Sequence, residues 1–202
     1  MPQVPFNPIA SIVRNKPRMP GAVDVIPEDV SFENQHSGEK IYVKARAHPF
    51  VNLGWVINLA FLIILPPIVF GLYLWIPFNF EITDFIPPLT IGIITITFYS
   101  AVFTNGFFNF IDWYYDIYLV TSERIINIQF SPLKTHRVSE AKLSDVEEVD
   151  ESVVGFFPQM FNYGDVRAST AARRSFFVFK SIPNPAWFRD VITDLTRYLR
   201  NR

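Results

Sequence analysis

Two long stretches without a charged side chain constrain this sequence more than any other feature. No Asp, Glu, Lys or Arg occurs from position 47 to 80, or again from 85 to 111. Charged residues form 18% of the chain, against about 25% in ordinary soluble domains, and these stretches account for the deficit. Because core helices of soluble proteins rarely run so far without a charge, the pattern predicts membrane spans over residues 50–76 and 85–111.

Prolines and aromatic residues refine this prediction. A helix over 50–76 is about 40 Å long, enough to cross a typical hydrocarbon core with some tilt. Pro66 and Pro67 predict a kink in its middle, whereas Pro87 and Pro88 stand near the start of the second span, where a missing N–H costs least. Residues 77–84 form a short extracytoplasmic connector. The aromatic residues near the span ends are typical of a membrane interface: Tyr73, Trp75, Trp113, Tyr114 and Tyr115.

The distribution of Lys and Arg predicts the orientation. The connector has neither residue, and most of the Lys and Arg residues follow the second span. Residues 38–49 form a basic juxtamembrane segment that contains Lys40, Lys44 and Arg46. Since positive residues stay on the cytoplasmic side, both termini are expected in the cytoplasm. The chain itself is expected to lie in the cell (plasma) membrane. Residues 1–37 are proline-rich, and we expect a disordered tail.

Residues 113–202 have the pattern of a separate cytoplasmic domain. Ile126, Ile128 and Phe130 alternate with polar residues, which is the period of a half-buried strand. Segments 164–169 and 176–180 predict a β-hairpin.

A helix is expected to close this domain. Asn184 is a good N-cap and Pro185 a natural first helical residue. The apolar residues that follow at helical spacing are Phe188, Val191, Ile192, Leu195 and Leu199. Such a stripe needs a sheet to cover it, so we expect a small barrel or bent sheet with this helix over its open end.

Five segments together resemble the bacterial pleckstrin-homology-like (PH-like) membrane proteins, in which two transmembrane helices precede a PH-like domain. They are GEKIYVKARAHP (38–49), YLVTSERII (118–126), LSDVEEVDESVVGFF (143–157), NYGDV (162–166) and FKSIPNP (179–185). The resemblance implies a membrane α-helical hairpin plus an α+β/all-β PH-like domain, a seven-stranded bent antiparallel barrel capped by the C-terminal helix. It also implies no enzymatic activity. Arg124 stands beside Glu123 with no basic cluster, so specific phosphoinositide binding is not expected.

Residue types also argue against an enzyme. The chain has no Cys, which excludes thiolate metal sites and cysteine nucleophiles. His36, His48 and His136 are scattered, and the glycines form no phosphate-binding loop. We therefore expect no catalytic, cofactor-binding or metal-binding residues and no small-molecule substrate. A net charge of -1 gives no overall attraction to nucleic acid.

A basic group near the predicted hairpin is the candidate binding site for lipid or a partner: Arg167, Arg173, Arg174 and Lys180. Each could contribute about 1 kcal/mol at an anionic leaflet. A solvated loop, or a strand edge that binds a protein partner or a second copy, is the alternative. The acidic run 145–151 is expected to be a solvated edge rather than a cation site. Phe156, Phe157, Met160 and Phe161 could enter the membrane interface, but in so small a barrel we expect them to close the core.

These features predict a membrane-anchored, non-enzymatic PH-like binding or scaffold module at the cytoplasmic face, acting through protein or lipid contacts. The alternative is an accessory subunit of a larger membrane complex, possibly concerned with transport or the envelope, whose activity lies in other chains. The spans contain no ionisable residue, which argues against a transport pathway in this chain alone.

Overall fold

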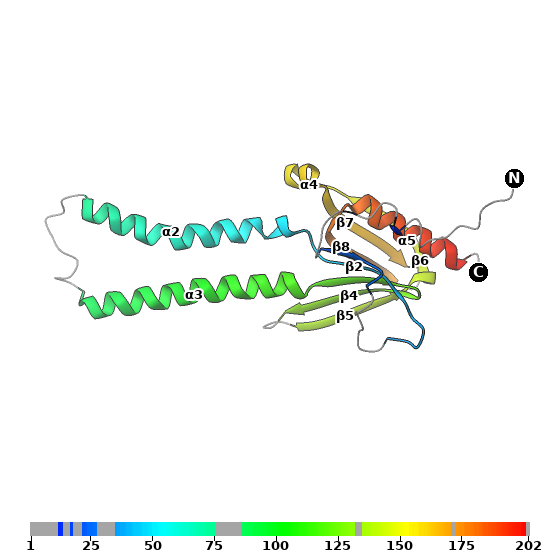
Figure 1. Ribbon diagram of the computed structural model, residues 1–202, viewed down its shortest axis with the longest axis horizontal. Coiled ribbons are helices and arrows are strands. Elements are labelled where there is room, and N and C mark those ends of the chain that lie inside the picture. The colour runs from blue at the N-terminus through cyan, green and yellow to red at the C-terminus, as the bar shows by residue number, and fades with distance from the viewer. Residues whose placement is uncertain are drawn as a thin grey trace. The chain divides into compact units, whose positions relative to one another are not determined.

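The computed structural model describes residues 12–13, 17, 22–27, 35–75, 86–131, 135–170 and 173–200. The chain divides into two compact units. We call Asn52–Ile111 the helical unit, and Met1–Val51 together with Asp112–Arg202 the β unit. The order of the elements is shown in Figure 1.

Two long apolar helices make up the helical unit. A short 3-10 turn, η1 (Pro49–Asn52), leads into α2 (Leu53–Trp75), and α3 spans Pro88–Tyr115. The segments Pro49–Trp75 and Pro88–Tyr115 have mean hydropathies of 2.3 and 1.5, and both are long and apolar enough to cross a membrane. A core helix of a soluble protein would be buried, whereas none of the apolar window of the first segment and 11% of that of the second is buried in the structure.

The helix bounds differ slightly from the predicted spans. α3 begins at Pro88, as its proline pair suggested, and continues past residue 111 to Tyr115. It continues because nothing in Asp112–Tyr115 breaks a helix, and the chain turns into a strand only at Ile117. The predicted connector 77–84 lies outside the described residues.

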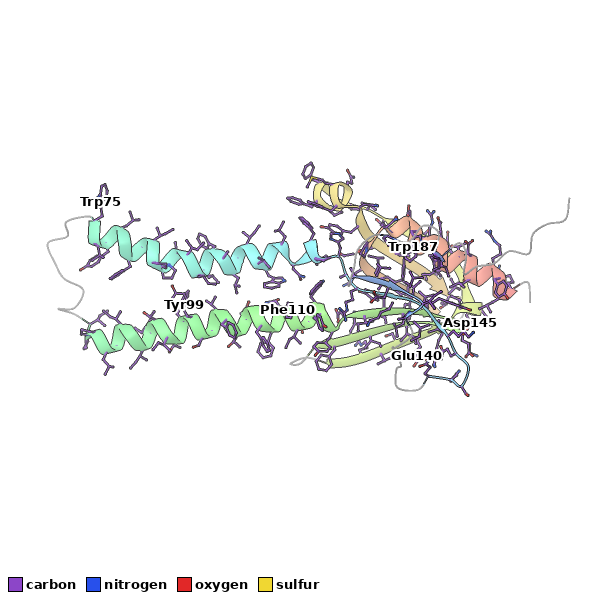
Figure 2. The ribbon with its side chains drawn as sticks, in the orientation of Figure 1. Trp75, Tyr99, Phe110, Glu140, Asp145 and Trp187 are labelled. Atoms are coloured by element: carbon purple, nitrogen blue, oxygen red, sulfur yellow. The ribbon has the colours of Figure 1, made fainter. Side chains whose placement is uncertain are left out.

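One hydrogen bond between the two helices involves a backbone carbonyl that a proline leaves without its helical donor. Pro67 lies within α2 and has no N–H to donate to the carbonyl four residues earlier, that of Ile63. The hydroxyl of Tyr99, which Figure 2 labels on α3, donates to this carbonyl oxygen at 3.2 Å. Backbone carbonyls in a membrane need such partners, so this hydrogen bond compensates for the proline and links the two helices.

The β unit contains two antiparallel sheets. The first has the order β1 (Val23–Val25), β2 (Ile41–Ala45), β3 (Ile117–Thr121), β4 (Arg124–Ser131) and β5 (Thr135–Lys142). The second has the order β6 (Val146–Ser152), β7 (Tyr163–Thr170) and β8 (Arg173–Pro183). A short turn, η3 (Leu143–Asp145), connects them, and two helices, α4 (Phe156–Phe161) and α5 (Pro185–Arg200), complete the unit.

Both sheets and α5 share one hydrophobic core. It includes Val43 and Tyr118 from the first sheet and Phe179 from the second. Trp187, which Figure 2 labels on α5, is 5% exposed, and the predicted apolar stripe of this helix lies on the same core. The predicted N-cap is present, since the Asn184 side chain accepts the Trp187 N–H. A β domain followed by a C-terminal helix is compatible with a PH-like fold, but among the described residues no strand ladder joins the two sheets into a closed barrel.

The β unit begins earlier in the chain than the predicted boundary at residue 113. Ile12 and Val23, both in the predicted tail, are fully buried, and β1 pairs with β2. β2 lies in the predicted juxtamembrane segment, where Val43 and Ala45 face the core and Lys44 does not. This alternation is the pattern of a half-buried strand.

The pairing of β2 with β3 makes the helical unit an insertion in the first sheet. Ala45 is paired with Tyr118, and Val43 with Val120. The chain therefore leaves the sheet after Ala45, forms both long helices, and returns to the neighbouring strand at Ile117.

Candidate functional site

The most buried polar cluster lies where the GEK segment meets the turn between β3 and β4. The Glu39 side chain is fully buried, and that of Arg124 is 11% exposed. Arg124 Nη2 lies 2.9 Å from Glu39 Oε2, and Arg124 Nε lies 3.1 Å from Oε1. This two-point ion pair is the strongest form of an arginine–carboxylate contact. The other side of the guanidinium bonds Glu140 of β5.

The remaining acceptor positions of Glu39 are also occupied. The Thr121 hydroxyl donates to Oε1 at 2.6 Å, and the His36 N–H donates to Oε2 at 3.1 Å. Burial alone would raise the pKa of Glu39, but the hydrogen bonds from Arg124, Thr121 and His36 lower it below the ordinary value of 4.5. The carboxylate is therefore charged and fully satisfied at neutral pH.

Backbone contacts fix the same turn. The Ser122 N–H donates to the Lys40 carbonyl, and the Ser122 hydroxyl accepts the Lys40 N–H. The Thr121 hydroxyl accepts the N–H groups of Glu123 and Arg124. We call Glu39, Thr121, Arg124 and Glu140 the ion-pair clamp, since it joins the segment before β2 to the β3–β4 turn.

The side chains at this place do not fit a metal site. His36, Glu39 and Glu123 offer ligand atoms within 4.8 Å of one another. However, both Glu39 oxygens already accept hydrogen bonds from a positive guanidinium and its neighbours. The His36 Nδ1 and Glu123 carboxylate contact each other at 2.7 Å on the surface. Glu39 is therefore part of the ion-pair clamp, and His36 and Glu123 form a separate surface contact.

The predicted basic group is only partly described. Arg167 on β7 and Lys180 on β8 are both exposed, and Arg173 and Arg174 begin β8, where the structure describes their backbone only. Arg167 is paired with Asp150 of β6, so an acidic residue lies opposite it on the sheet. The predicted acidic run lies in η3 and β6, an edge strand, and its exposed side chains share the surface of the three-stranded sheet with Arg167.

His48 is a buried histidine at the start of the first long apolar segment. Its side chain stacks on Tyr163 at 4.9 Å between ring centroids, and Nδ1 accepts the Phe50 N–H. Nε2 has no hydrogen-bond partner among the described residues. Burial lowers the pKa of His48 below 6.5, so the ring is neutral at pH 7.

The residues of α4 do not close the core as predicted. Phe156 is 74% exposed, Phe157 49% and Met160 54%. No residue of α4 belongs to the hydrophobic core of the β unit, so α4 lies outside it. Of the four residues predicted to close the core, Phe161 alone is partly buried, and it stacks on Phe50.

A groove lies between the two helices of the helical unit. Its volume is about 500 Å³, and it is lined by Trp55, Leu59, Ile63, Tyr99, Val102, Phe103, Gly106, Phe107 and Phe110. Gly106 packs against α2 beside this groove, since a Cβ at that position would lie 2.7 Å from Leu59 Cδ1. The groove is apolar almost throughout, so it suits a lipid chain or another helix rather than a polar substrate.

Comparison with known proteins gives little further information. No family model matches the chain, and no curated protein does. The chain is similar to the crystal structure of a DUF1696 family protein with a pleckstrin-homology domain from Shewanella loihica PV-4. The match has a TM-score of 0.34 and 12% sequence identity, and it covers 40% of this chain and 70% of that one. At this level the similarity supports no conclusion about function.

Proposed function

We propose that this chain is a membrane-anchored, non-enzymatic binding module with a PH-like β unit at the cytoplasmic face of the plasma membrane. The supporting observation is the insertion of two exposed apolar helices between the paired strands β2 and β3. Because both ends of the insertion return to one sheet, the helix pair as a whole starts and finishes on the side of the membrane where the β unit lies. The positions of Lys and Arg favour the cytoplasm as that side.

A binding role is favoured because the charged groups of the ion-pair clamp make internal contacts, whereas strand edges of the β unit are available to a partner. The ion-pair clamp uses its charged groups for internal contacts, which leaves no free acid, base or nucleophile there. The β unit instead offers edges: β5 and β8 are outer strands in the described sheets. An outer strand can accept a strand from a protein partner.

Single cysteines test the proposed topology, because the chain has no native Cys. Ser144→Cys lies in the β unit, and Asn79→Cys in the predicted connector. With a membrane-impermeant maleimide, we expect Asn79→Cys to react in intact cells with a permeabilised outer layer and Ser144→Cys only after lysis. The reverse labelling pattern would contradict the orientation, and extraction of the protein by carbonate would contradict membrane insertion.

Lipid contact by Arg167, Arg173, Arg174 and Lys180 is a part of the proposal with its own test. The full chain is needed, because residues 113–202 alone lack β1 and β2. In nanodiscs with anionic lipid, Arg173→Glu/Arg174→Glu should increase protease access to the β unit, whereas Arg197→Glu on α5 should not. Equal access in neutral and anionic nanodiscs for the native chain would exclude the lipid contact.

An accessory subunit of a larger membrane complex is the second candidate, and the groove between α2 and α3 favours it. A helix of another chain would fill this apolar space. Purification in mild detergent separates the two proposals, since a stoichiometric membrane partner would support the subunit role. Substituting Gly106 or Phe103 should then release that partner.

A further inference from the structure

The connection between β6 and β7 projects from the β unit as an apolar tip (Figure 1). Ser152 is paired with Asp165, so the two ends of the connection lie side by side. Gly164 is required at this base, because a Cβ there would lie 2.5 Å from the Ser152 carbonyl oxygen. α4 occupies the tip, and no Asp, Glu, Lys or Arg occurs from position 153 to 162.

Four large apolar side chains of this tip are exposed. They are Val154, Phe156, Phe157 and Met160, and we call them the apolar foot; Val154 is 79% exposed. Two phenylalanines with this exposure are costly in water, and such a patch marks a surface that another phase or molecule covers. None of these four side chains belongs to the hydrophobic core of the unit.

One contact relates the foot to the membrane. The ring of Phe161, at the end of α4, stacks on Phe50 with 3.5 Å between centroids. Phe50 belongs to the first membrane-spanning candidate, Pro49–Trp75. Phe50 and Phe161 both belong to the β unit, so this contact does not depend on how the two units are arranged.

The short length of α4 keeps the foot close to Phe50. Phe156 and Phe161 are five positions apart, about 8 Å along a helix. Interfacial helices bury their apolar side chains roughly 5–10 Å into the boundary between head groups and acyl chains. The foot is therefore within reach of this boundary wherever Phe50 marks the start of the span.

We infer that the apolar foot inserts into the head-group–acyl boundary of the membrane that α2 enters, as a third attachment of the β unit. The occupant is the lipid surface rather than a protein, because the foot is attached to the residue at which the chain itself becomes apolar. This inference rests on the proposed membrane insertion of α2 and α3. It adds that the β unit is held against the bilayer and does not move freely on its two connections.

Single cysteines carrying an environment-sensitive fluorophore test the inference in the full chain, reconstituted in neutral phosphatidylcholine vesicles. The sites are Phe157→Cys in the foot, Glu148→Cys on β6 as the matched exposed control, and Leu65→Cys in α2. Lipids with a nitroxide near the head group quench shallow labels, and lipids with a nitroxide near the chain end quench deep ones. We expect a blue shift and several-fold stronger quenching by the shallow nitroxide at Phe157→Cys than at Glu148→Cys.

The Leu65→Cys label separates the two levels of the proposal. Loss of its quenching by the deep nitroxide would overturn membrane insertion itself. Normal quenching at Leu65→Cys, with a Phe157→Cys label as accessible to aqueous quencher as that at Glu148→Cys, would overturn only the foot. A Phe157→Cys label could also be protected from the aqueous quencher without being quenched by either nitroxide. If that protection disappeared when the protein was diluted in lipid, the foot would be a site of self-association, and the inference would be overturned.

A second label position avoids replacing one of the two phenylalanines that are proposed to insert. With the label at Met160→Cys, Phe156→Ser/Phe157→Ser should abolish shallow quenching and leave quenching at Leu65→Cys unchanged. Unchanged quenching at Met160→Cys would show that the phenylalanines do not hold the tip in the membrane.

Discussion

Glu39 and Arg124 form a buried two-point ion pair across 85 positions of the chain. The contact joins the segment before β2 to the residue that begins β4, and it encloses the whole helical unit between its partners. Removal of one partner from a buried pair leaves an uncompensated charge, which costs far more than the pair contributes when intact.

We therefore predict that Glu39→Gln lowers the free energy of unfolding of the β unit by about 3 kcal/mol. The full chain is unfolded with urea in mild detergent, and limited proteolysis of the β unit measures the unfolded fraction at each urea concentration. Glu140→Gln is the matched control, because the Glu140 side chain is 40% exposed. It should change the free energy by about 1 kcal/mol or less. Equal effects of the two variants would contradict the assignment of the clamp.

Acid should destabilise the β unit through His48. Its folded pKa is lowered by burial. Below pH 6.5 the unfolded chain binds a proton at His48 that the folded protein does not yet bind. The free energy of unfolding therefore falls as the pH decreases from 6.5 toward the folded pKa, and above 6.5 this group has no effect.

His48→Phe keeps an aromatic ring against Tyr163 and removes the titration. We expect the unfolding midpoint of this variant to change less between pH 7 and pH 5.5 than that of the native chain. Thermal unfolding at a series of pH values in one detergent measures the difference. Parallel curves for the two proteins would mean that His48 does not cause the dependence.

The hydrogen bond from Tyr99 to the Ile63 carbonyl should stabilise the pair of helices. Tyr99→Phe removes the donor to this carbonyl, which already lacks its helical donor at Pro67, and we expect a loss of about 1 kcal/mol. Unfolding in mixed detergent, monitored by the circular dichroism signal of the helices, measures this loss of stability. Thr97→Val is the control, since the Thr97 hydroxyl donates to Ile93 within α3 and links nothing else.

Gly106 is expected to set the closest approach of α2 and α3. Gly106→Ile forces its side chain against Leu59 and should destabilise the helical unit by about 1–3 kcal/mol. Gly92→Ile on the same helix should have little effect, because nothing lies within 4 Å of a Cβ at that position. The same detergent unfolding experiment compares them, and an equal loss in both variants would reject a packing role for Gly106.

Local sequence patterns predicted the elements that are stabilised by contacts between residues close together in the sequence. The β7–β8 hairpin and α5 follow from alternation and from an N-cap with an apolar stripe, and both are confirmed. β2 was missed because Lys40, Lys44 and Arg46 were interpreted as flanking charges of a span. The alternation of Ile41, Val43 and Ala45 was the available signal. β1 is three residues long, too short for a recognisable period.

The candidate site was less predictable for a physical reason. The pairing of Glu39 with Arg124 depends on a sheet that brings distant segments together, and a single sequence carries no local sign of it. The exposure of Phe156, Phe157 and Met160 was also missed. Apolar residue types show that a segment avoids water, but not whether it turns toward the core or toward another apolar phase.

The insertion of the helices between β2 and β3 also imposes an order on biosynthesis. β2 leaves the ribosome before either apolar helix, whereas β3, its partner, is made after both. If the helices cross the bilayer as proposed, the first sheet cannot be completed until both have been integrated. A failure of integration then leaves β2 with unpaired backbone groups, a known cause of aggregation. Under the proposed topology, a folded β unit would therefore report that both helices have been inserted.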